Sequence, residues 1–295
     1  VQEIMHRVES AIYGLFVDDS YLAPCPMPKT FASFGLDSPH PAIIMEDVTG
    51  ATVCDVVDGF TERQIYTIMD GIIGLQVMSY SSDKWSQCAP MKVFEAEPAY
   101  GFTDLCSNFV TALATKEPRL APSLKKIFTH VVYNHEWFIN YYLEFLDESN
   151  KMRCLVHGDM WSPQFLWRGE KLAAIVDWQM AHVGSPVSDF LRLTTLCIPV
   201  KERLRLKEPL LKYYYRELTT RLEKKGAKVP FSFEELMEEY KKRLPITAGM
   251  GLFAYCMWAN SPVLRRGAVD DDERVAEIQS RVMSIVNECI DVHGW

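Results

Sequence analysis

The most informative stretch of this sequence is LVHGDMWSPQFLW at residues 155–167, which AIVDWQ follows at residues 174–179. Each stretch reads as a short apolar strand that leads into a carboxylate, first Asp159 and then Asp177. Gln164 follows Asp159 five positions later. An isolated His-Gly-Asp is usually only a turn. Together, however, two carboxylates and an amide at strand ends could orient an attacking hydroxyl and hold Mg²⁺ on nucleotide phosphates.

This arrangement resembles the pattern H-G-D-x-x-x-x-N followed by I-D-[FW], the signature of the aminoglycoside phosphotransferase and choline kinase branch of protein-kinase-like folds. Within that branch Trp161, the WQ pair at 178–179 and GSPVSDFLRL at residues 184–193 are most similar to the CHK kinase-like, or ecdysteroid-kinase-like, family. Upstream, IIMEDV at residues 43–48 resembles the hinge between the lobes, and PMPKT at residues 26–30 resembles the entry to a strand of the small lobe.

The resemblance extends from about residue 3 to residue 292 and implies an α+β, protein-kinase-like two-lobed fold. Residues 1–48 would be the remainder of a small N-terminal lobe, with a helix, two strands and the hinge. Residues 49–295 would form a large, mostly helical C-terminal lobe that holds the catalytic and metal-binding loops. The N-terminal lobe would be incomplete, because the chain starts at Val1 inside a helical pattern, and we expect native sequence upstream.

Carried over by position, the resemblance implies that Asp159 is the catalytic base and that His157 orients the catalytic loop. Asp177 would be the main Mg²⁺ ligand, assisted by Gln164. Asp189 would anchor the helix after the site and would not touch the substrate.

For ATP, the resemblance implies that backbone groups of Glu46 and Val48 hold the adenine edge. Glu9, on the first helix, would pair with a phosphate-contacting lysine, although a solvated helix face is an equally good reading of Glu9. The cofactors would be ATP and Mg²⁺, and the partner a small molecule with a hydroxyl group.

Two departures from the family pattern bear on activity. Gln164 stands where the pattern has Asn, and its extra methylene moves the ligand oxygen by about 1.5 Å unless the loop compensates. Residues 1–28 also contain neither a lysine nor a glycine-rich phosphate loop. Two functions therefore stay open: a kinase for a small-molecule hydroxyl, or a catalytically inactive pseudokinase that binds a ligand or partner.

The substrate is not encoded in these motifs. The family resemblance suggests a steroid-like or other apolar alcohol, while choline would need an aromatic and acidic cage, and aminoglycosides would need a strongly acidic cleft. Phe253, Tyr255 and Trp258 could wall a pocket, as could His135 and Trp137, but core packing is the simpler reading. The acidic run at residues 270–273 is most simply the favoured start of a helix.

Composition narrows the class of protein. Of 295 residues, 48% are hydrophobic and 24% charged, and 31 basic against 39 acidic side chains give a formal charge of −8. These values fit a globular chain and exclude a disordered or collagen-like one, and a pI near 5.5 argues against a nucleic-acid partner. The eight cysteines include no C-x-x-C pair, which favours reduced thiols and a cytoplasmic location. The uncharged residues 245–264 contain Gly, Asn and Pro, so a buried helix is expected there and no membrane span.

Hydrophobic periodicity predicts helices over residues 2–16, 61–78, 101–113, 123–147, 187–196, 210–222, 233–244, 250–258 and 275–292. Thr61 is the expected N-cap of the second of these. Short apolar runs predict strands at residues 30–34, 42–45, 154–156, 165–167 and 172–176. If this assignment is right, Asp159 and Asp177 converge on one site, with their carboxylates no more than about 10 Å apart.

Overall fold

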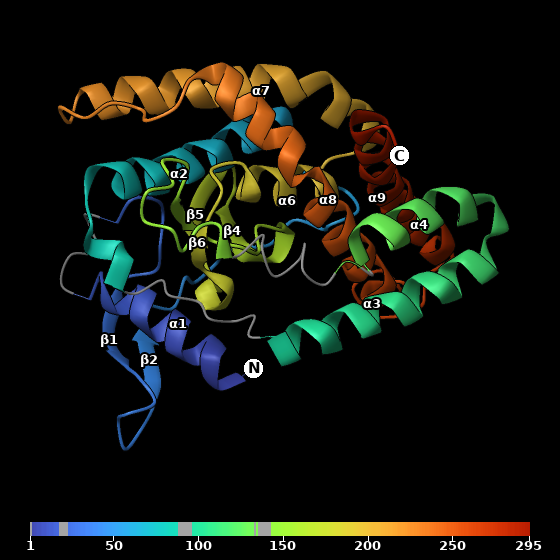
Figure 1. Ribbon diagram of the computed structural model, residues 1–295. Helices are drawn as coiled ribbons and strands as arrows, with labels where there is room; N and C mark the ends of the chain where they lie inside the picture. Colours follow the sequence, from blue (N-terminus) through green and yellow to red (C-terminus); the bar gives the residue numbers. More distant parts are fainter. Residues whose placement is uncertain (1, 18–22, 88–95, 133, 135–142) are drawn as a thin grey trace.

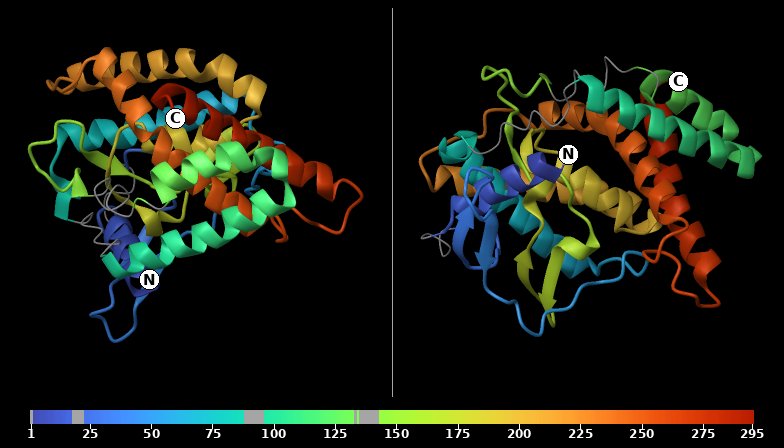
Figure 2. Two further views of the ribbon diagram at one scale, coloured as in Figure 1. Left: turned by 45° about the vertical axis from the view of Figure 1, so that its right-hand side comes forward. Right: turned by 90° about the horizontal axis from the view of Figure 1, so that it is seen from below.

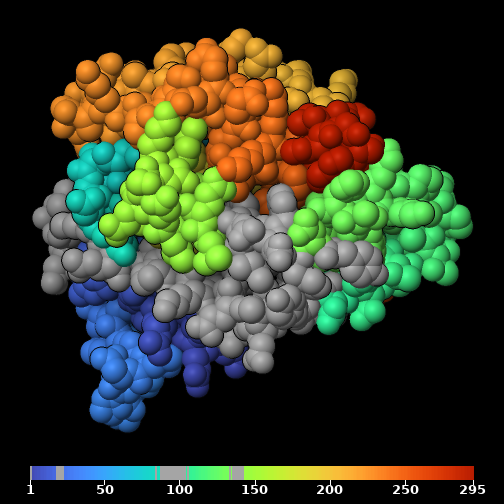
Figure 3. All heavy atoms as spheres, viewed as in Figure 1, coloured from blue at the N-terminus to red at the C-terminus, as the bar shows by residue number. Residues whose placement is uncertain are grey.

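The computed structural model describes residues 2–17, 23–87, 96–132, 134 and 143–295 (Figure 1). It begins with helix α1 (Gln2–Gly14), followed by strands β1 (Thr30–Phe34) and β2 (Ala42–Met45). The two strands pair antiparallel, with Thr30 opposite Met45 and Phe34 opposite Ala42, and α1 packs against both. Both strands have the predicted bounds. In the space-filling view this segment protrudes at the lower left (Figure 3).

Helix α2 (Glu62–Ser81) starts at the predicted N-cap. The Thr61 hydroxyl accepts from the Gln64 N–H at 3.3 Å, and the Gln64 side chain accepts from the Thr61 N–H at 2.9 Å, which makes a capping box. The apolar side of α2, including Ile65, Ile68 and Ile72, is buried against α7 (Val200–Glu223) and β3 (Cys154–Val156). The core of the large helical part therefore continues directly into the strand that precedes His157.

The strands near the candidate site form two small antiparallel pairs. Strand β4 (Phe165–Arg168) pairs with β5 (Lys171–Ile175), and β3 pairs with β6 (His182–Gly184). The sequence did not predict β6, because three residues that include a histidine and a glycine give no alternating apolar signal. Helices and strands together make an α+β fold, as predicted.

One long predicted helix is wrong. Residues 123–147 form the short helix α4 (Ala121–Ile127) and one turn of π-helix at Phe128–Val132, and residues 144–146 form a turn. The intervening residues 135–142, with His135 and Trp137, lie outside the described residues. Helix α3 (Ala96–Lys116) extends beyond its predicted range at both ends.

The C-terminal part is helical, with α6 (Ser188–Leu196), α7, α8 (Phe233–Trp258) and α9 (Asp271–His293). We expected two helices here, over residues 233–244 and 250–258, but α8 is continuous through Pro245. Pro245 lacks the N–H that would bond the Lys241 carbonyl, and the His293 ring nitrogen Nε2 bonds that carbonyl instead, at 3.1 Å. Figure 2 shows α8 and α9 crossing the molecule beside the strands.

Two further expectations concern cysteines and membranes. The seven cysteines within the described residues are all free thiols, and five of them are buried. Across the same residues, the structure contains no helix with the length and apolar character that crossing a bilayer would require. The stretch from residue 245 to 264 is largely the C-terminal half of α8, which packs against α3, α6 and α9.

Candidate active site

A buried carboxylate of α6 accepts hydrogen bonds from the backbone of the loop after β3. Asp189 accepts from the backbone N–H of His157 at 2.8 Å and from that of Gly158 at 2.9 Å. Asp189 is fully buried, and burial raises the pKa of its carboxyl even though the two N–H groups that donate to it act to lower that pKa. Asp189 therefore anchors the loop that carries Asp159.

The buried His157 ring forms hydrogen bonds to both segments of the candidate site, the loop with Asp159 and the strand end before Asp177. Its Nε2 donates to the Val176 carbonyl at 2.9 Å, and its Nδ1 accepts from the Asp159 N–H at 3.2 Å. Because a carbonyl only accepts, these two bonds fix the tautomer of a neutral ring. The ring also meets Trp178 edge-on, with centroids 4.7 Å apart. His157 thus orients the loop and contacts the residues on both sides of Asp177.

Backbone shape at this junction is unusual. Gly158 has φ of +83°, and a Cβ at this position would clash with the Met180 carbonyl oxygen, so the position requires glycine. Asp177 is also left-handed, with φ 66° and ψ 61°. Within the described residues it is the one non-glycine residue with positive φ. Such strained backbone is frequent at functional sites because surrounding contacts must hold it.

Gln164 joins the two carboxylates. Its Nε2 lies 2.6 Å from Asp177 Oδ2 and 3.5 Å from Asp159 Oδ2, and its backbone carbonyl accepts from the Val176 N–H at 3.0 Å. Two carboxylate oxygens within 3.5 Å of one nitrogen lie well within the expected 10 Å of each other. The structure therefore brings the three side chains to one point.

This trio suits a divalent cation. The point between the two carboxylates favours positive charge. In the structure the Gln164 side-chain N–H groups, which carry partial positive charge, lie there. Exchanging the amide nitrogen and oxygen would give an all-oxygen set, which Mg²⁺ prefers. Among the described residues no group of three or more His, Cys, Asp or Glu side chains could hold a metal ion, so a cation here would depend on the Gln164 amide and on phosphate oxygens.

Helix α1 brings Glu9 to the same place. Glu9 contacts the turn that follows Asp177 and accepts a hydrogen bond from the Trp178 backbone. Burial raises the pKa of the Glu9 carboxyl, and the negative charge of Asp177 raises it further. Tyr13, one helical turn on, is buried and bonds the Asp177 backbone. Glu9 is thus partly buried beside Asp177, and its pairing with a phosphate-contacting lysine stays a prediction.

Sequence reasoning missed Arg192. Its Nη2 and Nε donate to Asp159 Oδ1 at 2.7 Å and 3.1 Å, which makes a partly buried ion pair. The guanidinium also lies over the Trp258 ring, 5.9 Å from the centroid. The one available signal was helical spacing, because Arg192 follows Asp189 by three residues and so lies on the same face of α6.

The two predicted adenine-binding residues lie just beyond β2. The Glu46 N–H donates to the Lys29 carbonyl at 2.8 Å, and the Val48 carbonyl accepts from the Ala51 N–H at 3.1 Å. That these two residues hold the adenine edge stays a prediction.

Several other predicted features have structural roles. The Asp271 side chain accepts from the N–H groups of Arg266 and Gly267, so the acidic run stabilises the start of α9. Tyr255 is buried in the core, whereas Trp258 stacks on Trp161 with centroids 4.5 Å apart.

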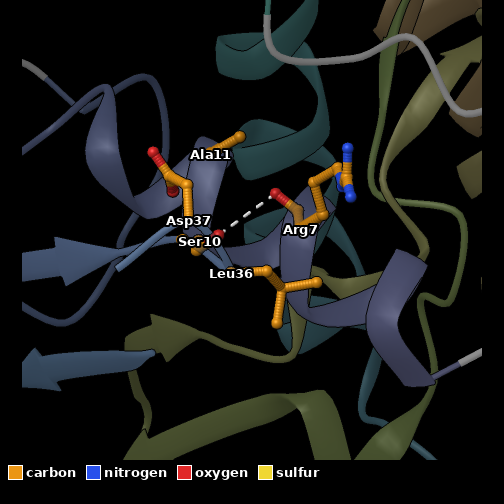
Figure 4. Close-up of a pocket in the computed structure, with 6 residues that line it drawn as sticks. Arg7, Ser10, Ala11, Leu36 and Asp37 are labelled. Atoms are coloured by element: carbon orange, nitrogen blue, oxygen red, sulfur yellow. Dashed lines mark hydrogen bonds between the residues drawn. The ribbon is translucent and has the colours of Figure 1, made fainter. Parts of the chain in front are cut away.

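The pocket drawn in Figure 4 is a different feature from this site. It lies between α1 and the turn that joins β1 to β2, with Arg7, Leu36 and Asp37 around it. Within it the Ser10 hydroxyl donates to the Arg7 carbonyl at 3.2 Å. None of the predicted site residues lines it.

A family model described as "Uncharacterized oxidoreductase dhs-27", DUF1679, matches residues 2–294. The chain belongs to this family. The Caenorhabditis elegans protein "Uncharacterized oxidoreductase dhs-27" is 25% identical over 215 residues, which are 68% of this chain and 25% of the relative. The match spans about a quarter of that relative's length, so the activity in its name describes a much longer protein.

Solved structures similar to this DUF1679 chain include aminoglycoside phosphotransferases. ADP-bound APH(2'')-Ib has a TM-score of 0.44 at 15% identity, covering 97% of this chain and 84% of that one. The streptomycin–ATP complex of APH(2'')-IIa has a TM-score of 0.42 at 17% identity, covering 96% and 83%. Both of these proteins are aminoglycoside phosphotransferases.

Proposed function

We propose that this chain catalyses Mg²⁺-assisted transfer of the γ-phosphoryl group of ATP to a hydroxyl group of a small molecule. The observation that carries the proposal is the meeting of Asp159, Gln164 and Asp177 at one amide nitrogen, at 3.5 Å and 2.6 Å from the two carboxylates. Phosphoryl transfer needs little beyond positioning and charge stabilisation, and this trio supplies a base beside a set of metal ligands.

In the proposed reaction the residues of the site have separate roles. Arg192 holds Oδ1 of Asp159, so Oδ2 is the oxygen that would accept the hydrogen bond of the acceptor hydroxyl. As the hydroxyl oxygen forms its bond to the γ-phosphorus, the bond from that phosphorus to the β–γ bridging oxygen breaks and ADP leaves with both electrons of that bond, while the hydroxyl proton passes to Oδ2. When bound, Mg²⁺ would supply positive charge at the phosphates. His157 and Asp189 keep the loop in place through their bonds to its backbone.

A second function, ligand binding without phosphoryl transfer, is favoured by the surroundings of Glu9. Burial and then the negative charge of Asp177 raise the pKa of the Glu9 carboxyl, so two acids lie close together here. An acid that faces a second acid opposes the binding of an anionic nucleotide. The pseudokinase interpretation therefore predicts weak binding of ATP and no turnover.

ATP consumption tests the choice between the two functions. The purified protein would be assayed with Mg²⁺ and ATP against neutral cyclic alcohols, choline and aminocyclitols. For a kinase, Asp159→Asn should lower turnover by about 10²–10⁴-fold, because the amide cannot accept the proton. Asp37→Asn, a matched change of an exposed aspartate, should not. Equal turnover by wild type and Asp159→Asn would remove Asp159 as the base, and ligand binding without any turnover would favour the pseudokinase.

A further inference from the structure

Three parts of the fold close a ring of side-chain contacts around the candidate base. Asp159, in the loop after β3, pairs with Arg192 of α6, and the Arg192 guanidinium lies 5.9 Å from the ring centroid of Trp258, the last residue of α8. Trp258 stacks on Trp161, with centroids 4.5 Å apart and an interplanar angle of 18°. Trp161 follows Asp159 by two residues, so the contacts return to the loop in which they began.

The orientation of the Asp159 carboxylate depends on Arg192. Oδ1 accepts from Arg192 Nη2 at 2.7 Å and from Nε at 3.1 Å, whereas the Gln164 amide nitrogen lies 3.5 Å from Oδ2. A separation of 3.5 Å is at the outer limit of a hydrogen bond, and bonds between two charged groups are the stronger ones. The direction in which the free oxygen Oδ2 points therefore depends on where the guanidinium is held.

The fold restrains Arg192 at both ends of its side chain. Its backbone belongs to α6, where Asp189 accepts from the N–H groups of His157 and Gly158 in the same loop. Its guanidinium lies over the face of Trp258, and the side chain is only 17% exposed. A long side chain has many rotamers unless packing restricts them. The aromatic face therefore limits where the guanidinium can lie.

Trp258 is itself fixed by the turn that ends α8. Its carbonyl accepts from the Ser261 N–H at 2.9 Å and from the Ser261 hydroxyl at 3.0 Å. The next carbonyl, of Ala259, accepts from Arg265 Nε at 2.9 Å. The indole ring is in addition stacked on Trp161. With its backbone and its ring both held, Trp258 can restrict the guanidinium beside it.

We propose that Arg192 and Trp258 are positioning residues of the reaction proposed above: Arg192 fixes the carboxylate of Asp159, and Trp258 acts on Asp159 only through Arg192. The inference rests on the proposed function, because it concerns the base of phosphoryl transfer. Neither residue takes up or gives away the proton. Without either of them Oδ2 can turn away from the acceptor hydroxyl, so kcat should fall while the KM for ATP changes little.

Turnover with Mg²⁺, ATP and the acceptors named above tests the positioning role. Arg192→Gln should lower kcat by about 10²-fold and change the KM for ATP by less than about threefold. Trp258→Leu should lower kcat by about tenfold, and Trp258→Phe by less, because a phenyl ring still offers a face to the guanidinium. Trp295→Leu, a matched change of a ring that stacks on His130 and His293, should leave kcat unchanged.

A double variant separates action through Arg192 from a general loss of structure. If Trp258 acts only through Arg192, the Arg192→Gln, Trp258→Leu protein should turn over ATP no more slowly than Arg192→Gln does. Losses that multiply, or equal losses in Trp258→Leu and Trp258→Phe, would overturn the inference. Faster turnover by Arg192→Gln would overturn it as well, because the ion pair would then block the base.

Urea unfolding tests the same contacts without nucleotide or acceptor. Arg192→Gln, Asp159→Asn and the double variant give the coupling of the ion pair as a factor in the unfolding equilibrium constant. This factor should be at least about threefold in the wild-type background and should fall towards one in the Trp258→Leu background. Trp258→Phe should give an intermediate factor, and it replaces Trp258→Leu if that variant does not fold. A coupling that neither change of Trp258 reduces would overturn the inference.

The two proposals fail in different ways. A coupling of Arg192 to Asp159 that depends on Trp258, without any ATP consumption by the wild type, would support the positioning of Asp159 and refute phosphoryl transfer. ATP consumption that depends on Asp159, with losses that multiply in the Arg192→Gln, Trp258→Leu protein, would leave the kinase assignment intact and refute the positioning role of Trp258.

Discussion

At the scale of single residues, the site is a balance between two carboxylates that repel each other and the amide that separates them. Gln164 is one methylene longer than the Asn of the family pattern, and we had expected this to displace its amide from the site. Its amide nitrogen nevertheless donates to Asp177 at 2.6 Å. The same side chain approaches Asp159 at 3.5 Å. Removing a charge from this set should affect cation binding much more than shortening the amide.

Asp177→Asn should therefore lower the Mg²⁺-dependent part of ATP affinity by at least about tenfold, because an amide offers the metal a dipole where a carboxylate offers a charge. Gln164→Asn should preserve that affinity, since it keeps the amide oxygen. Calorimetric titration of ATP with and without Mg²⁺ measures both variants. If Asp177→Asn bound ATP and Mg²⁺ as tightly as wild type does, Asp177 would not be a metal ligand.

The position of Glu9 makes stability depend on pH. Burial and the charge of Asp177 raise the pKa of the Glu9 carboxyl above its usual 4.5. The folded chain therefore takes up this proton at a higher pH than the unfolded chain, so stability is gained as pH falls through the raised pKa towards 4.5. At pH 8 the ionised carboxylate destabilises the fold.

Glu9→Gln should accordingly raise the melting temperature at pH 8 and raise it less near pH 5. Glu3→Gln, a matched change at an exposed position of the same helix, should show little dependence on pH. Thermal melts of the three proteins at both pH values measure this. A gain for Glu9→Gln that was the same at both pH values would show that its origin is not ionisation.

Sequence reasoning worked best where the motif itself carries the chemistry. Asp159, Gln164 and Asp177 are fixed in order along one motif, so their convergence could be predicted. Arg192 could not be found in this way, because it meets Asp159 only through the packing of α6, 33 residues later. The left-handed backbone of Asp177 was also invisible, since no glycine marks it.

At the scale of elements, the strands with apolar alternation and the capped helix were predictable, and errors arose where tertiary contacts override local signals. Two helices were predicted where α8 is continuous, and the His293 ring bonds the carbonyl that Pro245 leaves without its helical donor. The π-helical turn at residues 128–132 likewise ends α4 within an apolar pattern that continues.

Helix α2 is hydrogen-bonded to the strand that leads into the candidate site. The hydroxyl of Ser79, near its end, accepts from the Leu155 N–H at 3.0 Å, and Leu155 lies in the strand before His157.

Thr61→Ala removes the capping box at the start of α2 and should lower the free energy of unfolding by about 1 kcal/mol. Thr61→Ser keeps a capping hydroxyl and should lower it much less. Urea unfolding measures both, and equal losses would show that the cap hydroxyl contributes nothing.

At the scale of the whole molecule, the candidate site joins segments that the chain order separates widely: α1, the loops after β3 and β5, and α6. Their arrangement depends on arginines of α9 that cross the core. Arg281, 1% exposed, donates to the carbonyls of Val56 and Val57 and, at 2.9 Å, to that of Leu196. These contacts fasten the segment before α2 to the end of α6. No local sequence pattern encodes such a link. The division of the chain into two lobes at residue 48 stays a prediction.

Arg281→Leu should therefore destabilise the protein by about 3 kcal/mol or more, because three buried carbonyls would lose their donor at once and each unsatisfied group costs about 1–3 kcal/mol. Arg281→Lys should recover part of this loss, since an ammonium group still reaches some of the carbonyls. Glu277→Gln removes the charge of the ion-pair partner of Arg281 but keeps an acceptor for the Arg281 Nε–H and all three carbonyl bonds, so it should cost less than Arg281→Leu does. Denaturant unfolding gives all three values, and a small loss for Arg281→Leu would mean that the loop before α2 is held mainly by apolar packing.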